Sequence, residues 1–155
     1  MSLFLSTTIN RVDKKGRVSV PAPFRTALSV ETFQGVVLFQ SYTQQAIEGV
    51  GMSALQDLSN RIDTHFDLFS DTHDDMATIL FGESLQCAFD GDGRITLPQK
   101  LCDFAGITDQ VAFVGLGRKF QLWSPEKLEI RKRSARQSVQ KKSVTLPSIK
   151  GSNND

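Results

Sequence analysis

The period of the apolar positions changes along the chain and predicts short strands alternating with short helices. Residues with β propensity recur over 5–20 and Val18-Ser-Val20 alternates between apolar and polar, so this segment is expected to form two strands that pair across a turn at Lys15-Gly16. Pro21 stops the second strand and suits the first position of a helix, where a missing N–H costs nothing. A further strand is expected at residues 36–40.

Two helices are predicted in the middle of the chain. Over residues 52–68 the apolar side chains recur every three or four positions, which is typical of an amphipathic helix, and Ser53 can cap it. A second helix is expected over residues 73–81. Its apolar face consists of Met76, Ile79 and Leu80.

One segment occurs twice. Asp13-Lys-Lys-Gly-Arg-Val-Ser-Val-Pro21 recurs 77 residues later as Asp90-Gly-Asp-Gly-Arg-Ile-Thr-Leu-Pro98, with Asp, Gly, Arg and Pro identical at matching positions. An internal repeat sets the architecture, and two copies are too few for a solenoid. We therefore expect a pseudo-dimer whose halves pack face to face.

The second copy predicts the same order of elements and completes an α+β fold that is mainly β. The expected elements are strands at 85–89 and 94–97 around a turn at 91–93, a helix from Pro98 to Gly106, a hairpin over 111–123 and a helix from Ser124 to about Ser138. The predicted organisation is a first repeat at 1–51, connecting helices at 52–82, a second repeat with a C-terminal helix at 83–138 and a disordered basic tail at 139–155.

Composition narrows the class of protein. The 155 residues, 39% hydrophobic and 23% charged, are ordinary for a soluble protein of one domain or two small ones. Cys87 and Cys102 have no metal-type spacing and suit a reducing cytoplasm. The N-terminal residues lack the features of a signal peptide, and no apolar run approaches the length of about 18 residues that a membrane span needs.

Charge is distributed unevenly. Residues 1–117 hold eight Lys and Arg against fourteen Asp and Glu, whereas residues 118–150 hold ten against two. Within the first segment, residues 57–75 carry six Asp and one Arg. The basic segment is either an ordinary solvated helix or a surface that faces a polyanion.

The repeated Asp-x-x-x-Arg pattern offers a chemistry for DNA recognition. A two-stranded ribbon or its loop can enter the major groove, where Arg17 or Arg94 can reach guanine O6 and N7. Asp13 or Asp90, four residues earlier, can hold the guanidinium in one orientation, or can accept from cytosine N4. Without further information a cross-turn salt bridge that only pins the loop is an equally good interpretation.

Neighbouring residues extend the candidate DNA-binding site. Gly16 and Gly93 allow a close approach of the backbone to phosphate. Phosphate contacts, which add affinity but no sequence information, are expected from Arg11, Lys14, Lys15 and Arg25. Because Lys14-Lys15 is basic and Gly91-Asp92 is acidic, we expect the first copy to contribute more of the electrostatic affinity.

At these residues the chain resembles the MraZ family, bacterial two-repeat proteins of the AbrB-type swapped-hairpin barrel class. The segment from Asp13 to Arg25 resembles the first signature of the family, and Cys87-Ala-Phe-Asp-Gly-Asp-Gly-Arg-Ile-Thr-Leu-Pro98 resembles the second. The resemblance covers residues 1–138. The Asp-rich 57–75 segment, and the glycines of Ala46-Ile-Glu-Gly-Val-Gly51, which are expected to weaken the junction there, depart from the pattern.

The resemblance implies a sequence-specific DNA-binding transcriptional regulator. It also implies a cytoplasmic, nucleoid-associated protein whose usual target is its own promoter, upstream of a division and cell-wall gene cluster. Ring-like homo-oligomers are implied as well, and these would bind tandem repeats in double-stranded DNA by avidity. We expect no cofactor, no resident metal and no membrane partner.

Three alternatives stay open. A metal site can be drawn from the His and Asp residues His65, Asp67, Asp71, His73, Asp74 and Asp75, although a polar helical surface explains them better. An enzyme is not expected, because the chain has no nucleophile elbow, P-loop or HExxH motif. The serious rival is an oligomeric scaffold that binds nucleic acid without sequence preference.

The basic helix can contact phosphate, RNA or a neighbouring protomer. Its charges at Arg131, Lys132, Arg133 and Arg136 complement the acidic 57–75 segment, so we hypothesise an electrostatic contact between protomers there. Phe120 and Trp123 are expected to belong to the core rather than to stack on bases.

Overall fold

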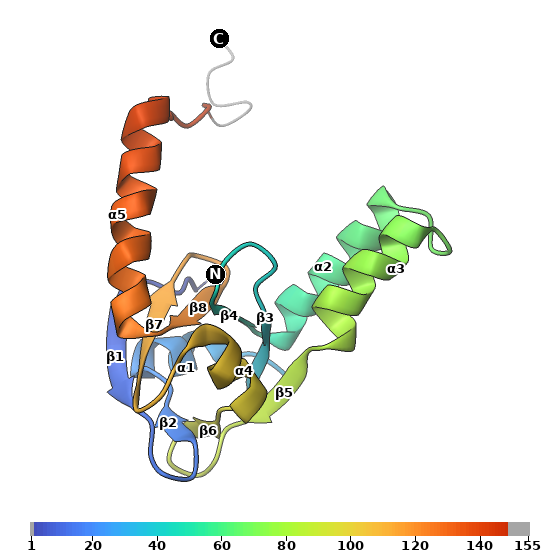
Figure 1. The fold of residues 1–155 in the computed structure, drawn as a ribbon. Coiled ribbons are helices and arrows are strands. Elements are labelled where there is room, and N and C mark those ends of the chain that lie inside the picture. Colours follow the sequence, from blue (N-terminus) through green and yellow to red (C-terminus); the bar gives the residue numbers. More distant parts are fainter. Residues whose placement is uncertain (1, 149–155) are drawn as a thin grey trace. The chain divides into compact units, whose positions relative to one another are not determined.

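A computed structural model describes residues 2–148, which divide into two compact units at the junction of Pro125 and Glu126. The first unit contains eight strands and most of the helices, and the second contains the long C-terminal helix (Figure 1). The strands are β1 (Thr7–Arg11), β2 (Arg17–Ser19), β3 (Gly35–Gln40), β4 (Ile47–Val50), β5 (Leu85–Ala88), β6 (Arg94–Thr96), β7 (Gln110–Gly115) and β8 (Phe120–Trp123). The helices are α1 (Ala22–Leu28), α2 (Met52–His65), α3 (Asp71–Ala77), the π-helix η1 (Thr78–Gly82), α4 (Gln99–Ala105) and α5 (Pro125–Lys142).

The six-stranded antiparallel sheet shows the repeat directly. Its strand order, β1-β7-β8-β4-β3-β5, is palindromic, because β1 corresponds to β5, β7 to β3 and β8 to β4. Glu48 of β4 pairs with Gln121 of β8 at the centre of this order. A pseudo-twofold axis therefore passes between β4 and β8.

The first strand of each repeat pairs with a strand of the other repeat. β1 pairs with β7 of the second repeat, and β5 pairs with β3 of the first (Figure 1). The expectation that β1 and β2 pair as a local hairpin is wrong, as is the expectation of halves packed face to face. The apolar alternation indicated strands correctly, but it cannot specify a partner that lies about a hundred residues away.

The repeated motif itself forms a second, two-stranded sheet. β2 pairs with β6 in the register Arg17 with Thr96, Val18 with Ile95 and Ser19 with Arg94. Val18 and Ile95 are equivalent positions of the two copies, so the pseudo-twofold axis passes between them too. At the ends of the ribbon, the N–H of Leu97 donates to the Gly16 carbonyl at 2.8 Å and the N–H of Val20 to the Gly93 carbonyl at 3.2 Å.

A single apolar core joins the ribbon to the sheet. Val18 and Ile95, each 1% exposed, pack in the same cluster as apolar residues of β3, β4, β7 and β8. Phe4, Phe24 and Phe120 meet there at ring-centroid distances of 4.9 to 5.2 Å. Phe120 and Trp123 are buried, as the sequence predicted. Because both repeats supply this core, neither half can keep it alone.

The helix ends differ in detail from the expectations. Pro21 and Pro98 are N-cap residues with extended backbone, so α1 and α4 begin one residue later than predicted. Gly106 caps α4 with φ 70°, as expected for a residue that must adopt a left-handed conformation.

The connecting helices pack on a separate apolar cluster with Val37, Phe39 and Val50 of the sheet. Ser53 does not cap α2 through its own side chain: Gly51 is the N-cap, and both the N–H and the hydroxyl of Ser53 donate to the Glu31 carboxylate, at 2.9 and 2.6 Å. The second predicted helix is α3 followed by η1. Its predicted face is only partly buried, because Ile79 is 40% exposed.

α5 continues to Lys142, beyond the predicted end near Ser138, so its last turn occupies the start of the expected tail. Helix formers such as Gln and Lys extend it there. Residues 144–148 have no regular structure, and the rest of the expected tail lies outside the described residues.

Glycines at the end of the first repeat lie where other groups approach the backbone closely. A Cβ built on Gly49 would lie 2.6 Å from Cζ of Phe120, its cross-strand partner in β8. A Cβ on Gly51 would lie 2.8 Å from the Glu31 carboxylate. The glycines at the end of the first repeat therefore leave room for the Phe120 ring and for the Glu31 contact, which the expectation of a weakened junction did not foresee.

Gly49→Ala is expected to destabilise the protein by about 1–3 kcal/mol, because the buried Phe120 ring cannot move aside without strain. The measurement is urea unfolding followed by circular dichroism. Gly91→Ala is the matched control, since a Cβ at Gly91 meets nothing within 4 Å. Equal stability of the two variants would show that Phe120 has room to shift.

Candidate nucleic-acid interface

The outward face of the β2–β6 ribbon carries the two arginines of the repeat. Side chains alternate across a strand, so while Val18 and Ile95 enter the core, their neighbours point outward. The outward positions are Arg17, Ser19, Arg94 and Thr96. Diagonal neighbours of this kind lie about 7–8 Å apart, so Arg17 and Arg94 share one small face rather than occupying distant loops.

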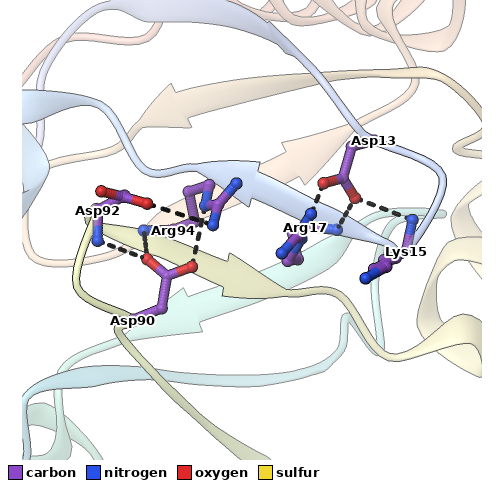
Figure 2. A network of polar contacts seen from close by, with 6 residues as sticks. All are labelled: Asp13, Lys15, Arg17, Asp90, Asp92 and Arg94. Atoms are coloured by element: carbon purple, nitrogen blue, oxygen red, sulfur yellow. Dashed lines mark hydrogen bonds and ion pairs between the residues drawn. The ribbon is translucent and has the colours of Figure 1, made fainter.

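The first loop holds Arg17 through one carboxylate. Oδ1 of Asp13 accepts the backbone N–H groups of Lys15 at 2.9 Å and Arg17 at 2.8 Å, while Oδ2 accepts Nε of Arg17 at 2.8 Å (Figure 2). The N–H of Gly16 donates to the Asp13 carbonyl at 3.0 Å, and Gly16 has φ 81°. A bulkier residue would be strained in that conformation.

The second loop repeats this geometry almost atom for atom. Oδ1 of Asp90 accepts the N–H groups of Asp92 at 2.8 Å and Arg94 at 2.9 Å, and Oδ2 accepts Nε of Arg94 at 2.9 Å (Figure 2). Gly93 takes φ 73°. The Asp-x-x-x-Arg spacing is therefore explained: the carboxylate closes a turn and orients a guanidinium at the same time.

Neither ion pair is buried. The side chains of Arg17 and Arg94 are 35% and 30% exposed, and both Asp side chains are 37% exposed. Such a pair adds little to stability, because solvent screens it. The carboxylate instead orients each guanidinium through its Nε, and an oriented guanidinium suits recognition of a base edge or a phosphate.

Hydrogen bonding lowers the pKa of both loop carboxyls below the ordinary value. For Asp13 the largest cause is the backbone N–H of Arg17, and desolvation opposes it. For Asp90 the largest cause is the backbone N–H of Arg94. Both loops therefore keep their carboxylates ionised, and their arginines held, throughout the neutral range.

The predicted phosphate-binding cations lie around this face but not symmetrically. Arg11, Lys14 and Lys15 are exposed near the first loop. Arg25, although close to the first loop in sequence, donates its Nε to the Val20 carbonyl at 3.1 Å and lies against Gly93 of the second loop.

Asp92 was not predicted as a site residue, yet it contacts Arg94. Its Oδ2 lies 3.4 Å from Nη2 of Arg94, and its side chain is 79% exposed. Lys15 occupies the equivalent position in the first loop with the same backbone contact. Aligning the two copies and asking which position reverses charge would have identified it.

The remaining candidate chemistry lies elsewhere. His73 contacts Asp63, with 2.8 Å between Nε2 and Oδ1, and no group of three potential ligands suited to a metal ion is found within residues 2–148. Burial raises the pKa of the Cys87 thiol to about 11 and also raises that of Cys102, so neither is a ready nucleophile. A cavity of about 730 Å³ between the sheet and α2 is lined by no residue of either loop.

Fold and site together define an α+β protein of the two-repeat, swapped-hairpin AbrB type, in which each repeat contributes one Asp–Arg loop to a common ribbon. The family model described as “MraZ protein, putative antitoxin-like” matches residues 80–146. The transcriptional regulator MraZ of Rickettsia akari (strain Hartford) is 43% identical over 146 residues, covering 94% of this chain and 97% of the relative. That of Rickettsia canadensis (strain McKiel) is 44% identical over the same shares. The chain therefore belongs to the MraZ family of transcriptional regulators.

No helix within residues 2–148 has the length and apolarity that a membrane span requires.

Arg17→Ala is expected to leave most of the lowering of the Asp13 pKa in place, because its largest cause is a backbone N–H that alanine retains. Carboxyl chemical shifts followed by NMR during an acid titration measure this. Since the folded pKa is depressed, the contribution of Asp13 to stability is present above the unfolded pKa and is lost as pH falls through the folded pKa. A return of the Asp13 pKa to its ordinary value would show that the guanidinium dominates instead.

Proposed function

We propose that the chain is a sequence-specific DNA-binding transcriptional regulator that reads double-stranded DNA with the outward face of the β2–β6 ribbon. The regulator class follows from the family. The DNA-reading role is assigned to the loops through Arg17 and Arg94, oriented by Asp13 and Asp90, with Gly16 and Gly93 allowing a close backbone approach.

One observation carries the proposal: two guanidinium groups, each fixed by its own carboxylate, lie on one exposed ribbon face. A two-stranded ribbon fits the major groove. The two strand positions lie about 7–8 Å apart, which is about two base-pair steps of about 3.4 Å, so the two arginines can reach bases within one short stretch of DNA. Because each guanidinium is already oriented, little side-chain entropy is lost on docking.

Non-specific affinity is assigned to the cations around the ribbon. Arg11, Lys14, Lys15 and Arg25 can neutralise phosphates and release counterions, which makes binding depend on salt. The first loop, with two lysines, is proposed to supply more of this affinity than the second. A protomer that touches so few phosphates binds weakly by itself.

A homo-oligomeric ring is proposed to overcome this weakness. Several ribbons on one particle bind tandem DNA repeats with a high effective concentration, so avidity replaces the affinity of one protomer. The promoter proposed as target is that of the protein's own gene, upstream of a division and cell-wall cluster. In this proposal the protein acts at the nucleoid in the cytoplasm, without a cofactor and without catalysis.

An oligomeric scaffold with non-specific nucleic-acid binding is the alternative. The Asp–Arg pairs are compatible with it, because each pair closes its own loop whether or not DNA is bound. The two functions differ in what the arginines do, so they can be separated by substitution.

Wild-type protein is expected to shift DNA from upstream of its own gene in the presence of excess unrelated DNA, whereas Arg17→Ala/Arg94→Ala is expected to lose this preference. Each bidentate arginine contributes about 1–3 kcal/mol of discrimination. The measurement is a mobility-shift assay at several salt concentrations. Equal binding by both proteins, with an unchanged salt slope, would favour the scaffold.

Charge reversal of Arg131, Lys132 and Arg133 to Glu is expected to reduce the oligomer mass measured by light scattering. The physical reason is repulsion from the acidic 57–75 segment of a neighbouring protomer. Reversal of Lys14 and Lys15 is the control, because these residues lie beside the DNA-facing ribbon. An unchanged mass would place the protomer contact elsewhere.

A further inference from the structure

The two loops have the same backbone conformation but different net charges. Asp13, Lys14, Lys15 and Arg17 give the first loop a charge of +2, whereas Asp90, Asp92 and Arg94 give the second a charge of −1. A loop that carries net negative charge is repelled by phosphate. If both loops bind DNA, something must compensate the second.

Asp92 deepens this difference. Arg94 is engaged by two carboxylates, Oδ2 of Asp90 at 2.9 Å and Oδ2 of Asp92 at 3.4 Å. The ion pair of Arg17 within its own loop is with Asp13, at 2.8 Å. The Nη2 atom of Arg94 therefore has an internal partner that competes with a base or a phosphate.

Arg25 is the cation that the structure places at the second loop. A Cβ built on Gly93 would lie 2.8 Å from Cδ of Arg25 and 2.9 Å from its Nε and Nη1, so the side chain crosses directly over this glycine. The bond from Nε to the Val20 carbonyl fixes it there, and the N–H of Val20 donates to the Gly93 carbonyl. Arg25 comes from the first repeat, so the second loop is built by both repeats.

The first loop has no such cover. The position equivalent to Arg25 in the second repeat is Cys102, which is buried in the core. A Cβ on Gly16 would meet only the Leu97 carbonyl and Cγ2 of Thr96, at 3.5 and 3.8 Å. An arginine side chain therefore covers the glycine of the second loop but not that of the first. The exchange of strands between the repeats brings Arg25 of the first repeat to the second loop.

We propose that Arg25 is a positioning residue for the second loop and not for the first: it holds the loop at Gly93 and supplies the positive charge that lets Arg94 approach DNA. This inference rests on the proposed DNA-binding function. In the sequence Arg25 follows the first copy of the motif, whereas in the fold it lies against Gly93 of the second.

The test is a set of double-mutant cycles on DNA affinity, measured with the promoter fragment at several salt concentrations. Arg25→Gln is expected to weaken binding by about three- to tenfold and to lower the salt slope by about one. In an Arg94→Ala background its effect is expected to fall below about twofold, whereas in an Arg17→Ala background it is expected to persist in full. Arg94→Lys replaces Arg94→Ala if the latter leaves no measurable binding.

Two controls accompany the cycles. Lys14→Gln, a loss of one charge in the first loop, is expected to show the reverse pattern, with a reduced effect in the Arg17→Ala background only. Arg25→Lys keeps the charge and is expected to retain the salt slope, which a purely structural role for Arg25 would not predict. An Arg25→Gln effect that is equal in both backgrounds, or smaller beside Arg17→Ala, overturns the inference.

Free protein supplies a readout that does not depend on DNA. Arg25→Gln is expected to shift the Gly93 amide resonance in an NMR correlation spectrum and to leave that of Gly16 in place. If Gly93 does not respond, the positioning role is wrong. If Gly93 responds but neither Arg17→Ala nor Arg94→Ala affects DNA binding, the proposed function fails while the loop assignment stands.

Discussion

The pairing of Val18 with Ile95 is the contact on which the rest of the molecule depends. It places equivalent residues of two repeats side by side on the pseudo-twofold axis and buries both in a core that neither repeat completes alone. β1 pairs with β7, and β5 pairs with β3. Each pairing joins strands of different repeats around that same core. Any change that separates the two repeats therefore removes the core and the β2–β6 ribbon together.

A second constraint acts at the other end of the axis, where Glu48 meets Gln121 inside the sheet. A buried carboxylate is costly unless it is paired and hydrogen-bonded. Here Gln121 donates to both oxygens at 3.1 and 3.2 Å and Lys119 approaches at 3.0 Å, while Trp123 donates to Oε1 of Gln121 at 2.9 Å. These contacts provide hydrogen-bond partners for the buried Glu48 carboxylate and the Gln121 amide. They also fix the register of β4 against β8, which apolar pairs alone would allow to slip.

Sequence reasoning predicted elements better than partners. The repeat, the turns at Gly16 and Gly93, the hairpin of β7 and β8, and the buried Phe120 and Trp123 all follow from local patterns, which is why they were predictable. The pairing of β1 with β7 is a long-range choice that alternation does not encode. The roles of Gly49 and of Arg25 were also inaccessible, because each depends on an atom that another repeat brings within contact distance.

Duplication explains why the site is symmetric in one respect and asymmetric in another. The turn needs an Asp that accepts two backbone N–H groups and a Gly that adopts positive φ, so these positions are identical in both copies. Nothing in the turn geometry restricts the residue between them, since only its N–H is used, and the position of Lys15 in the first loop is taken by Asp92 in the second. Charge can therefore diverge while the arginines keep their orientation. In a ribbon built this way, one loop can be basic and the other acidic without any change in fold.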